Sequence, residues 1–273
     1  MATLVALNKF PCDKDKTMLT SPQNPKLKLI RALRGRAKAR RKETAFLVEG
    51  VRLLEEAVAA NWKIRFVLYD RSLSERGRQL LAGLTDVDIE EVDTALLKSL
   101  GDTENPQGVL AVLEADSRLP LPDTPNFLLV LDQIRDPGNL GTLLRTAAAA
   151  GVDAVISAPG TTDAFAPKVL RAGMGAHFRL PIRKMAWAQI QEIMGGSTVF
   201  LADAAGEVAY TDANLKDACA LIIGGEAEGA SPAARDLAAQ RLYIPMPGKM
   251  ESLNAAVAGA ILLFEAVRQR DSI

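Results

Sequence analysis

The chain has 273 residues, of which 48% are hydrophobic, and its 33 basic and 33 acidic residues leave no net charge. This composition is typical of a soluble globular protein with one large or two ordinary domains. A single histidine and two distant cysteines, Cys12 and Cys219, argue against a zinc site and fit a reducing cytoplasm. The N-terminus has no basic segment before its short apolar patch, so we expect a cytoplasmic protein without a signal or transit peptide.

The first part of the chain predicts a small unit of alternating helices and strands over residues 18–116, preceded by a flexible extension over residues 1–17. We expect strands at Ala45–Gly50, Ile64–Asp70, 87–92 and Gly108–Glu114, and helices at 26–42, 51–62, 74–84 and 93–102. Asp93 is the expected N-cap of the last helix. Three prolines within residues 117–126 predict a linker.

The predicted helix over Lys26–Lys42 carries nine basic residues and no acidic one. Leu27, Ile30 and Leu33 share one helical face, which leaves the basic side chains outward. Such a run is either a solvated surface or a patch that follows the phosphates of a nucleic acid. If it binds RNA, the candidate contacts are Arg31, Arg34, Arg36, Lys38, Arg40 and Arg41.

The second part, residues 127–273, predicts an open α/β sheet. Phe127–Asp132 is a continuous apolar run, as in a parallel strand that is buried on both faces. Further strands are expected at 152–158, Thr198–Leu201, Ala218–Ile223 and Arg241–Ile244, and helices at 140–151, Ala166–Ala172, Ala186–Met194, Pro232–Gln240 and Ser252–Arg270. Open sheets of this kind bind ligands beyond the carboxyl ends of their strands.

Three of these strand ends carry polar or glycine-rich loops. Asn139 opens one helix and lies about 600° of rotation before Arg145, so the two do not share a face. Gly224 and Gly225 allow a ligand to approach the backbone next to Glu226. Ser252 and Asn254 stand where the last helix begins. Asn139 or Ser252 could equally be ordinary N-caps, with Asn254 a solvated residue of the first turn and Arg145 a surface charge.

No phosphate-binding P-loop or complete dinucleotide-binding glycine motif occurs. Instead, N-x-G-x-x-x-R-T-A (Asn139–Ala147), G-x-E-x-x-G (Gly224–Gly229) and I-P-M-x-G-x-x-x-S-L-N (Ile244–Asn254) resemble the three motifs of the SpoU (TrmH-type) family. These proteins are RNA ribose 2′-O-methyltransferases of the SPOUT class. Residues 18–116, with FLVEG and TENPQGVLAV, resemble the ribosomal-protein-like RNA-binding domain that is often fused in front.

The resemblance implies a C-terminal SPOUT α/β-knot domain with a deep trefoil knot, the cofactor S-adenosylmethionine, and a homodimer formed through this domain. From the histidine and cysteine counts we expect no metal. The resemblance also implies an active site formed by Arg145, Asn139, Glu226, Ser252 and Asn254, and cofactor contacts from Gly224, Ile244, Met246 and Leu253. Gly225 and Ala227 depart from the residues that the family more often has, which are serine or asparagine at the first position and glycine at the second.

The expected substrate is ribosomal RNA, because of the N-terminal domain. The alternatives are a 2′-O-methyltransferase that acts on transfer RNA and a non-catalytic RNA-binding or assembly factor with the same fold. The family account casts Arg145 as the base for the 2′-hydroxyl proton. Because a guanidinium is effectively always charged, our hypothesis is that Arg145 clamps the 3′-phosphate of the target nucleotide and lowers the pKa of its hydroxyl.

Overall fold

The structure is a computed structural model that describes residues 18–103, 106–115, 119–225, 229–248 and 250–271. It divides into two compact units, Met1–Asp116 with Phe165–Pro167, and Ser117–Ala164 with Lys168–Ile273. Within the described ranges no helix is both long and apolar enough to cross a membrane. In the same ranges no group of three or more histidine, cysteine, aspartate or glutamate residues is arranged to hold a metal ion.

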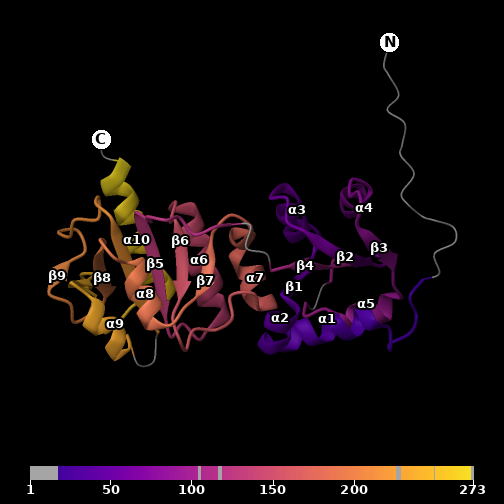
Figure 1. The fold of residues 1–273 in the computed structure, drawn as a ribbon, viewed down its shortest axis with the longest axis horizontal. Coiled ribbons are helices and arrows are strands. Elements are labelled where there is room, and N and C mark those ends of the chain that lie inside the picture. The colour runs from indigo at the N-terminus through magenta and orange to yellow at the C-terminus, as the bar shows by residue number, and fades with distance from the viewer. Residues whose placement is uncertain (1–17, 104–105, 116–118, 226–228, 249, 272–273) are drawn as a thin grey trace, which may run out of the picture. The chain divides into compact units, whose positions relative to one another are not determined.

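The N-terminal unit is a four-stranded mixed sheet with helices (Figure 1). Its strands are β1 (Ala45–Glu49), β2 (Ile64–Tyr69), β3 (Asp88–Glu91) and β4 (Val109–Glu114), in the order β1-β4-β2-β3, and its helices are α1 (Pro25–Gly35), α2 (Ala37–Glu43), α3 (Val51–Ala59), α4 (Glu75–Ala82) and α5 (Thr94–Leu100). All four predicted strands are present, and Asp93 is the N-cap of α5. Leu27, Ile30 and Leu33 are fully buried, as the helical spacing predicts, and join the core that includes Leu47 and Val112.

The prediction of one continuous basic helix is wrong. Arg36 adopts an extended conformation, with φ −132° and ψ 113°, and separates α1 from α2. Arg40 closes this break: its Nη1 atom donates to the carbonyls of Leu33 at 2.5 Å and Arg34 at 3.4 Å. These carbonyls belong to the last turn of α1, where helix carbonyls lack partners within the helix. Arg40 is therefore only 8% exposed, which leaves little of its side chain for an RNA contact.

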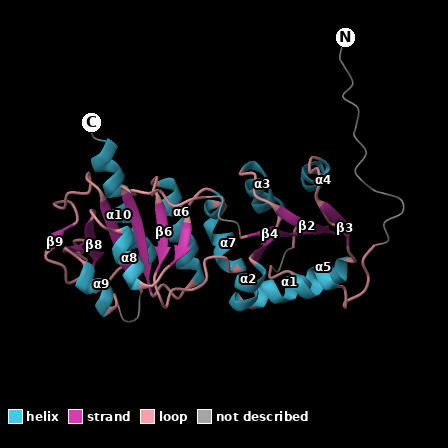
Figure 2. Cartoon of the chain, in the orientation of Figure 1, coloured by secondary structure: helices cyan, strands magenta, loops and turns pink. Residues whose placement is uncertain are grey.

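The C-terminal unit is a seven-stranded parallel sheet with helices on both faces (Figures 1 and 2). The strand order is β7-β6-β5-β10-β8-β11-β9. The strands are β5 (Phe127–Asp132), β6 (Ala154–Ser157), β7 (Ile182–Lys184), β8 (Thr198–Ala202), β9 (Val208–Ala209), β10 (Cys219–Gly224) and β11 (Gln240–Tyr243), and the helices are α6 (Pro137–Ala149), α7 (Pro167–Gly173), η1 (Ala176–Phe178), α8 (Trp187–Ile193), α9 (Pro232–Leu237) and α10 (Ala255–Asp271). The short strands β7 and β9 and the turn η1 were not predicted.

The centre of this sheet is the pair β5 and β10, whose apolar side chains are almost completely buried. Ile190, Met194 and Ala234, from or next to α8 and α9, pack in the cluster with Val130 and Ile222. Helices α6 and α10 pack against each other, and α10 also contacts β10. The continuous apolar run of β5 is explained by this cover on both faces.

Glycine permits the close approach of α6 to its neighbours. A Cβ atom on Gly259 of α10 would lie 2.4 Å from Cδ2 of Leu143 in α6. A Cβ atom on Gly141 of α6 would lie 2.3 Å from the Cβ of Ala172 in α7 and 2.8 Å from the Val169 carbonyl oxygen. Real Cβ atoms do not approach other atoms this closely. A larger residue at Gly141 would meet the backbone of α7 and force the helices apart, whereas one at Gly259 would require the Leu143 side chain to move.

All strand pairs of this sheet are parallel, so the loops that follow β5, β8, β10 and β11 leave from the same edge. The three polar or glycine-rich loops that were identified in the sequence, which follow β5, β10 and β11, therefore all lie at this edge.

Candidate active site

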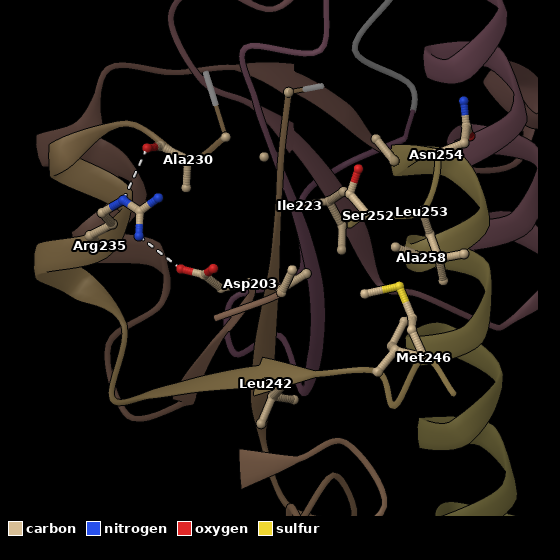
Figure 3. A pocket seen from close by; sticks show the side chains of 17 residues that line it. Asp203, Ile223, Ala230, Arg235, Leu242, Met246, Ser252, Leu253, Asn254 and Ala258 are labelled. Atoms are coloured by element: carbon tan, nitrogen blue, oxygen red, sulfur yellow. Dashed lines mark hydrogen bonds and ion pairs between the residues drawn. The ribbon is translucent and has the colours of Figure 1, made fainter. Parts of the chain in front are cut away.

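A cavity of about 480 Å³ lies at this carboxyl edge (Figure 3). Five segments line it: the end of β8, the end of β10 with its loop, α9, β11 with the segment after it, and the start of α10. The lining residues are Ala202, Asp203, Ala204, Ile223, Gly224, Gly225, Gly229, Ala230, Arg235, Leu242, Ile244, Met246, Ser252, Leu253, Asn254, Ala255 and Ala258. The volume falls within the range of roughly 300–1,000 Å³ that is usual for small-molecule sites.

One wall of the cavity is backbone. A Cβ atom on Gly224 would lie 2.8 Å from the backbone nitrogen of Ala230, and one on Gly225 would lie 2.4 Å from the Gln133 carbonyl oxygen. Neither contact could be relieved by a flexible side chain, so both positions need glycine in this conformation. Gly225 departs from the family pattern, and the close approach of the Gln133 carbonyl explains why this chain has glycine there.

The opposite side is mostly apolar. Ile244, Met246, Leu253 and Ala258 line it together with Ile223, and Figure 3 shows Met246, Leu253 and Ala258 on neighbouring segments of the β11–α10 connection and α10. The four residues that the resemblance implies as cofactor contacts, which are Gly224, Ile244, Met246 and Leu253, all line this cavity. Their roles in binding stay a prediction.

Asn254 joins two of the three loops. Its Nδ2 atom donates to Oδ1 of Asn139 at 3.1 Å, across 115 positions of sequence. Its Oδ1 atom accepts from the backbone nitrogens of Ala256 at 2.9 Å and Val257 at 3.3 Å. Asn254 therefore caps the positive N-terminus of α10 while it holds the loop after β5 next to the cavity.

Both predicted helix starts are corrected by these contacts. Helix α10 begins at Ala255, not at Ser252, so the cap is Asn254. Helix α6 begins at Pro137, and its cap is Asp136, whose Oδ1 accepts from the backbone nitrogen of Asn139 at 2.8 Å. Asn139 is the third helical residue, which frees its side chain for the contact with Asn254.

The remaining predicted site residues are placed differently. Ser252 lines the cavity and is exposed. Arg145 is exposed on α6 and does not line the cavity, and its side chain makes no hydrogen bond or ion pair with the residues that the structure describes. Glu226, like Ala227, falls outside the described residues.

An ion-pair network at the cavity was missed by the sequence reasoning. Arg235 donates from Nη1 to Oδ2 of Asp203 at 2.8 Å and from Nε to the Ala230 carbonyl at 3.3 Å (Figure 3). Arg241 pairs with Asp203 at 3.8 Å and with Glu207, and the Arg241 guanidinium lowers the pKa of that glutamate. The one available signal in the sequence was an aspartate that directly follows an apolar run, since Asp203 comes after Thr198–Ala202.

The single histidine, His177, is not a candidate base. It does not line the cavity and is 1% exposed, with Nε2 2.8 Å from the Ala164 carbonyl oxygen. Burial lowers its pKa to about 4, so the ring is neutral at pH 7. A neutral Nε2–H group donates to that carbonyl and holds η1 in place.

Comparison with known proteins identifies the family to which this chain belongs. The sequence model of the SpoU rRNA methylase family matches residues 126–264, and that of the MRM3-like substrate binding domain matches residues 24–111. This chain belongs to the SpoU rRNA methylase family.

Two relatives illustrate the similarity to other members of the SpoU family. The 23S rRNA (guanosine(2553)-2′-O)-methyltransferase RlmP of Bacillus subtilis is 33% identical over 90% of this chain and 97% of its own. The 23S rRNA (uridine(2479)-2′-O)-methyltransferase of Streptomyces viridochromogenes is 36% identical over 92% of both chains.

Solved structures agree. The crystal structure of the SpoU methyltransferase AviRb from Streptomyces viridochromogenes in complex with the cofactor AdoMet superposes with a TM-score of 0.81, at 34% identity, over 92% of this chain and 99% of that one. The AdoMet-bound rRNA methyltransferase from Sinorhizobium meliloti gives a TM-score of 0.79 at 32% identity, over 92% and 97%. The mixed α/β fold with its parallel sheet is therefore that of the SpoU methyltransferases.

The double role of Asn254 can be separated by substitution. Asn254→Asp keeps an acceptor for the helix N-terminus but removes the donor to Asn139, so we expect a melting temperature close to wild type and a large loss of activity. Asn254→Ala removes both contacts and should also lower the free energy of unfolding by about 1 kcal/mol. Thermal denaturation and methyl-transfer assays measure the two effects. Equal activity of Asn254→Asp and the wild type would rule out a functional link to Asn139.

Proposed function

We propose that this protein transfers a methyl group from S-adenosylmethionine to a ribose 2′-hydroxyl of ribosomal RNA. The observation that carries the proposal is the cavity formed by the second and third family motifs, with Asn254 joining its rim to Asn139 of the first. Two relatives are named as 23S rRNA 2′-O-methyltransferases, and a similar structure contains AdoMet.

The lining of the cavity suits this cofactor. The backbone at Gly224 and Gly225 offers N–H and C=O groups without side-chain bulk, whereas Ile244, Met246 and Leu253 offer apolar surface for a purine ring. A Cβ atom at either glycine would meet backbone, so only glycine at these two positions is compatible with this conformation of the cavity wall. When bound, S-adenosylmethionine supplies an activated methyl group on its sulfonium.

Ser252, Asn254 and Asn139 provide hydrogen-bonding groups at the mouth of the cavity, and we assign them to holding the target ribose. The chemistry also requires that the 2′-hydroxyl lose its proton. A guanidinium is effectively always charged and does not readily accept it, so the proton would pass to a solvent water as the methyl group is transferred. We assign Arg145 to the 3′-phosphate of the target nucleotide, where its charge would lower the pKa of the neighbouring hydroxyl. Glu226 would orient an arginine or the ribose.

The exposed face of α10 supports a homodimer. Val257 is 48% exposed and Phe264 49%, and Leu253, just before the helix, is 37% exposed. Val257 and Phe264 are seven residues apart, which places them on one side of the helix, and Leu253 lies just before its first turn. A second copy of this chain would cover this apolar stripe, as the family resemblance implies. Because Arg145 is exposed on the adjacent helix α6 and does not line its own cavity, we propose that it serves the cavity of the other subunit.

The N-terminal unit is proposed to bind RNA, with residues 18–116 as the substrate-binding domain, 117–126 as a linker and 127–273 as the methyltransferase domain. Support comes from the exposed basic side chains around the break between α1 and α2, which are Lys28, Arg36, Lys38, Arg41 and Lys42. Arg31 and Arg34 are half-buried and donate to backbone carbonyls of Pro22, Ser99 and Gly101. Arg36, Lys38 and Arg41 are therefore the stronger candidates for phosphate contacts.

We also propose that the C-terminal unit carries the deep trefoil knot that the resemblance implies. After β11, which lies near one edge of the sheet, the chain returns so that α10 packs on α6 and on the central strand β10. An experimental structure in which residues 244–254 do not thread through an earlier loop would refute the knot.

Methylation of rRNA from cells that lack this gene tests the function. The wild-type protein with S-adenosylmethionine should introduce a 2′-O-methyl group at one position, which mapping by resistance to alkaline hydrolysis detects.

Arg145→Ala should reduce the rate by roughly 100-fold or more, as for loss of other charge-stabilising groups. Arg145→Lys should retain much of the activity if the side chain clamps a phosphate. Near-complete loss with Arg145→Lys, at unchanged RNA affinity, would reject the clamp. Failure of the wild type to bind the cofactor in calorimetry would reject the function.

The dimer is tested by charging its proposed interface. Val257→Glu with Phe264→Glu should convert a dimer into a monomer, because burying two unpaired carboxylates is costly. Sedimentation velocity measures the mass, and Ala188→Glu, at an exposed position of α8, is the control. If the doubly substituted protein keeps the mass of a dimer, this face is not the interface.

The basic patch is tested through the salt dependence of RNA binding. Lys38→Ala with Arg41→Ala should weaken binding to rRNA fragments and reduce the slope of log K against log salt by about 1–2, because each phosphate contact releases counterions. Lys98→Ala, at an exposed position on α5, is the control. An unchanged slope would assign RNA binding to another surface.

A further inference from the structure

Arg235 is a cation that lines the cavity and has no part in the proposed chemistry. It lies on α9, and its side chain is 43% exposed. Two of the guanidinium nitrogens are engaged, because Nε donates to the Ala230 carbonyl at 3.3 Å and Nη1 donates to Oδ2 of Asp203 at 2.8 Å. These two bonds fix the plane of the guanidinium, so the side chain is oriented before a ligand binds.

The third nitrogen of this guanidinium, Nη2, faces the cavity. It donates to no acceptor among the residues that the structure describes. A Cβ atom built on Gly229, which also lines the cavity, would lie 3.5 Å from it. Figure 3 shows Arg235 across the cavity from Asn254 and Ala258. The cavity thus contains a charged donor on the side opposite its apolar lining.

Asp203 orients this donor and is itself fully engaged. Its Oδ1 atom accepts from the backbone nitrogen of Ala205 at 3.0 Å, and its Oδ2 atom accepts from Arg235 and lies 3.8 Å from Nη1 of Arg241. Arg241 also pairs with Glu207 and does not line the cavity. The network therefore balances two cations with two anions. Of these four side chains, Arg235 is the one that presents an unused donor to the cavity.

The charges of the proposed cofactor leave one partner for this donor. S-adenosylmethionine has a positive sulfonium, a positive α-ammonium group and a negative α-carboxylate, whereas its adenosine part is uncharged. Of these groups, only the carboxylate has a charge opposite to that of a guanidinium. Arginine and carboxylate groups form charge-assisted hydrogen bonds, which are stronger than neutral ones.

We propose that Arg235 binds the α-carboxylate of S-adenosylmethionine through Nη2, with Asp203 as the residue that orients the guanidinium. The purine lies against the apolar side at Ile244 and Met246, and the aminocarboxylate chain extends toward α9. The inference rests on the proposed function, because it assigns a further contact of the same cofactor. Its consequence is selectivity for ligands that carry the carboxylate over ligands that lack it.

Decarboxylated S-adenosylmethionine tests this contact, because it differs from the cofactor only by the missing carboxylate. The wild type should bind it about tenfold more weakly or worse in calorimetry, as for the loss of a hydrogen bond to a charged group. Arg235→Ala should bind the cofactor about tenfold more weakly than the wild type does. The ratio of its affinities for the two ligands should fall to about one, because substitution and decarboxylation remove the same contact.

Arg241→Ala is the matched control. It removes the other arginine that pairs with Asp203, but from a position that does not line the cavity. This variant should keep the wild-type ratio of the two affinities. If thermal denaturation shows that Arg235→Ala does not fold, Arg235→Gln takes its place, because glutamine keeps a polar side chain without the charge.

Equal affinity of the wild type for the two ligands would overturn the inference, as would an unchanged ratio in the Arg235 variant or an equal fall of the ratio in Arg241→Ala. A higher KM for RNA at unchanged cofactor affinity in Arg235→Ala would also overturn it, and would assign the arginine to an RNA phosphate. A wild-type protein that binds neither ligand would instead refute the proposed function, and this contact with it.

Discussion

The packing of α10 against α6 is the contact on which the candidate site depends. Gly259 lets α10 approach Leu143 of α6, and this closeness allows Asn254 at the start of one helix to bond with Asn139 near the start of the other. The two asparagines belong to motifs that lie more than a hundred residues apart in the chain. Without the helix contact, the polar groups proposed to hold a ribose would not share one surface with the cavity.

The cavity itself is shaped by backbone more than by side chains. Gly224 and Gly225 permit contacts with Ala230 and Gln133 that any other residue would obstruct. A site of this kind tolerates substitution of many side chains, but it tolerates few changes in the conformation of its backbone. The same logic explains why the short glycine-containing motifs carry so much of the family resemblance.

Several charged residues of this chain stabilise its structure and are not available to a ligand. In the N-terminal unit, Arg40 is used to close the break between α1 and α2, and Lys26 pairs with Asp88 and Glu90. At the cavity, Asp203 is surrounded by Arg235 and Arg241. Not every residue in a basic run is therefore available to bind RNA, because some of the guanidinium groups donate hydrogen bonds to carbonyls that have no partner at the ends of helices.

The sequence by itself determined the kinds of elements, the buried stripe of α1, the continuous burial of β5 and the three loops at strand ends, because hydrophobic periodicity and glycine placement are local signals. Sequence alone did not predict that Asn254 caps α10, that Arg36 breaks the basic helix, or that Asp203 pairs with Arg235. Each of these depends on partners distant in the chain or on competition between neighbouring caps, which only the tertiary structure decides. The same holds for the hydrogen bond that Asp132 accepts from the backbone nitrogen of Ser231, 99 positions away.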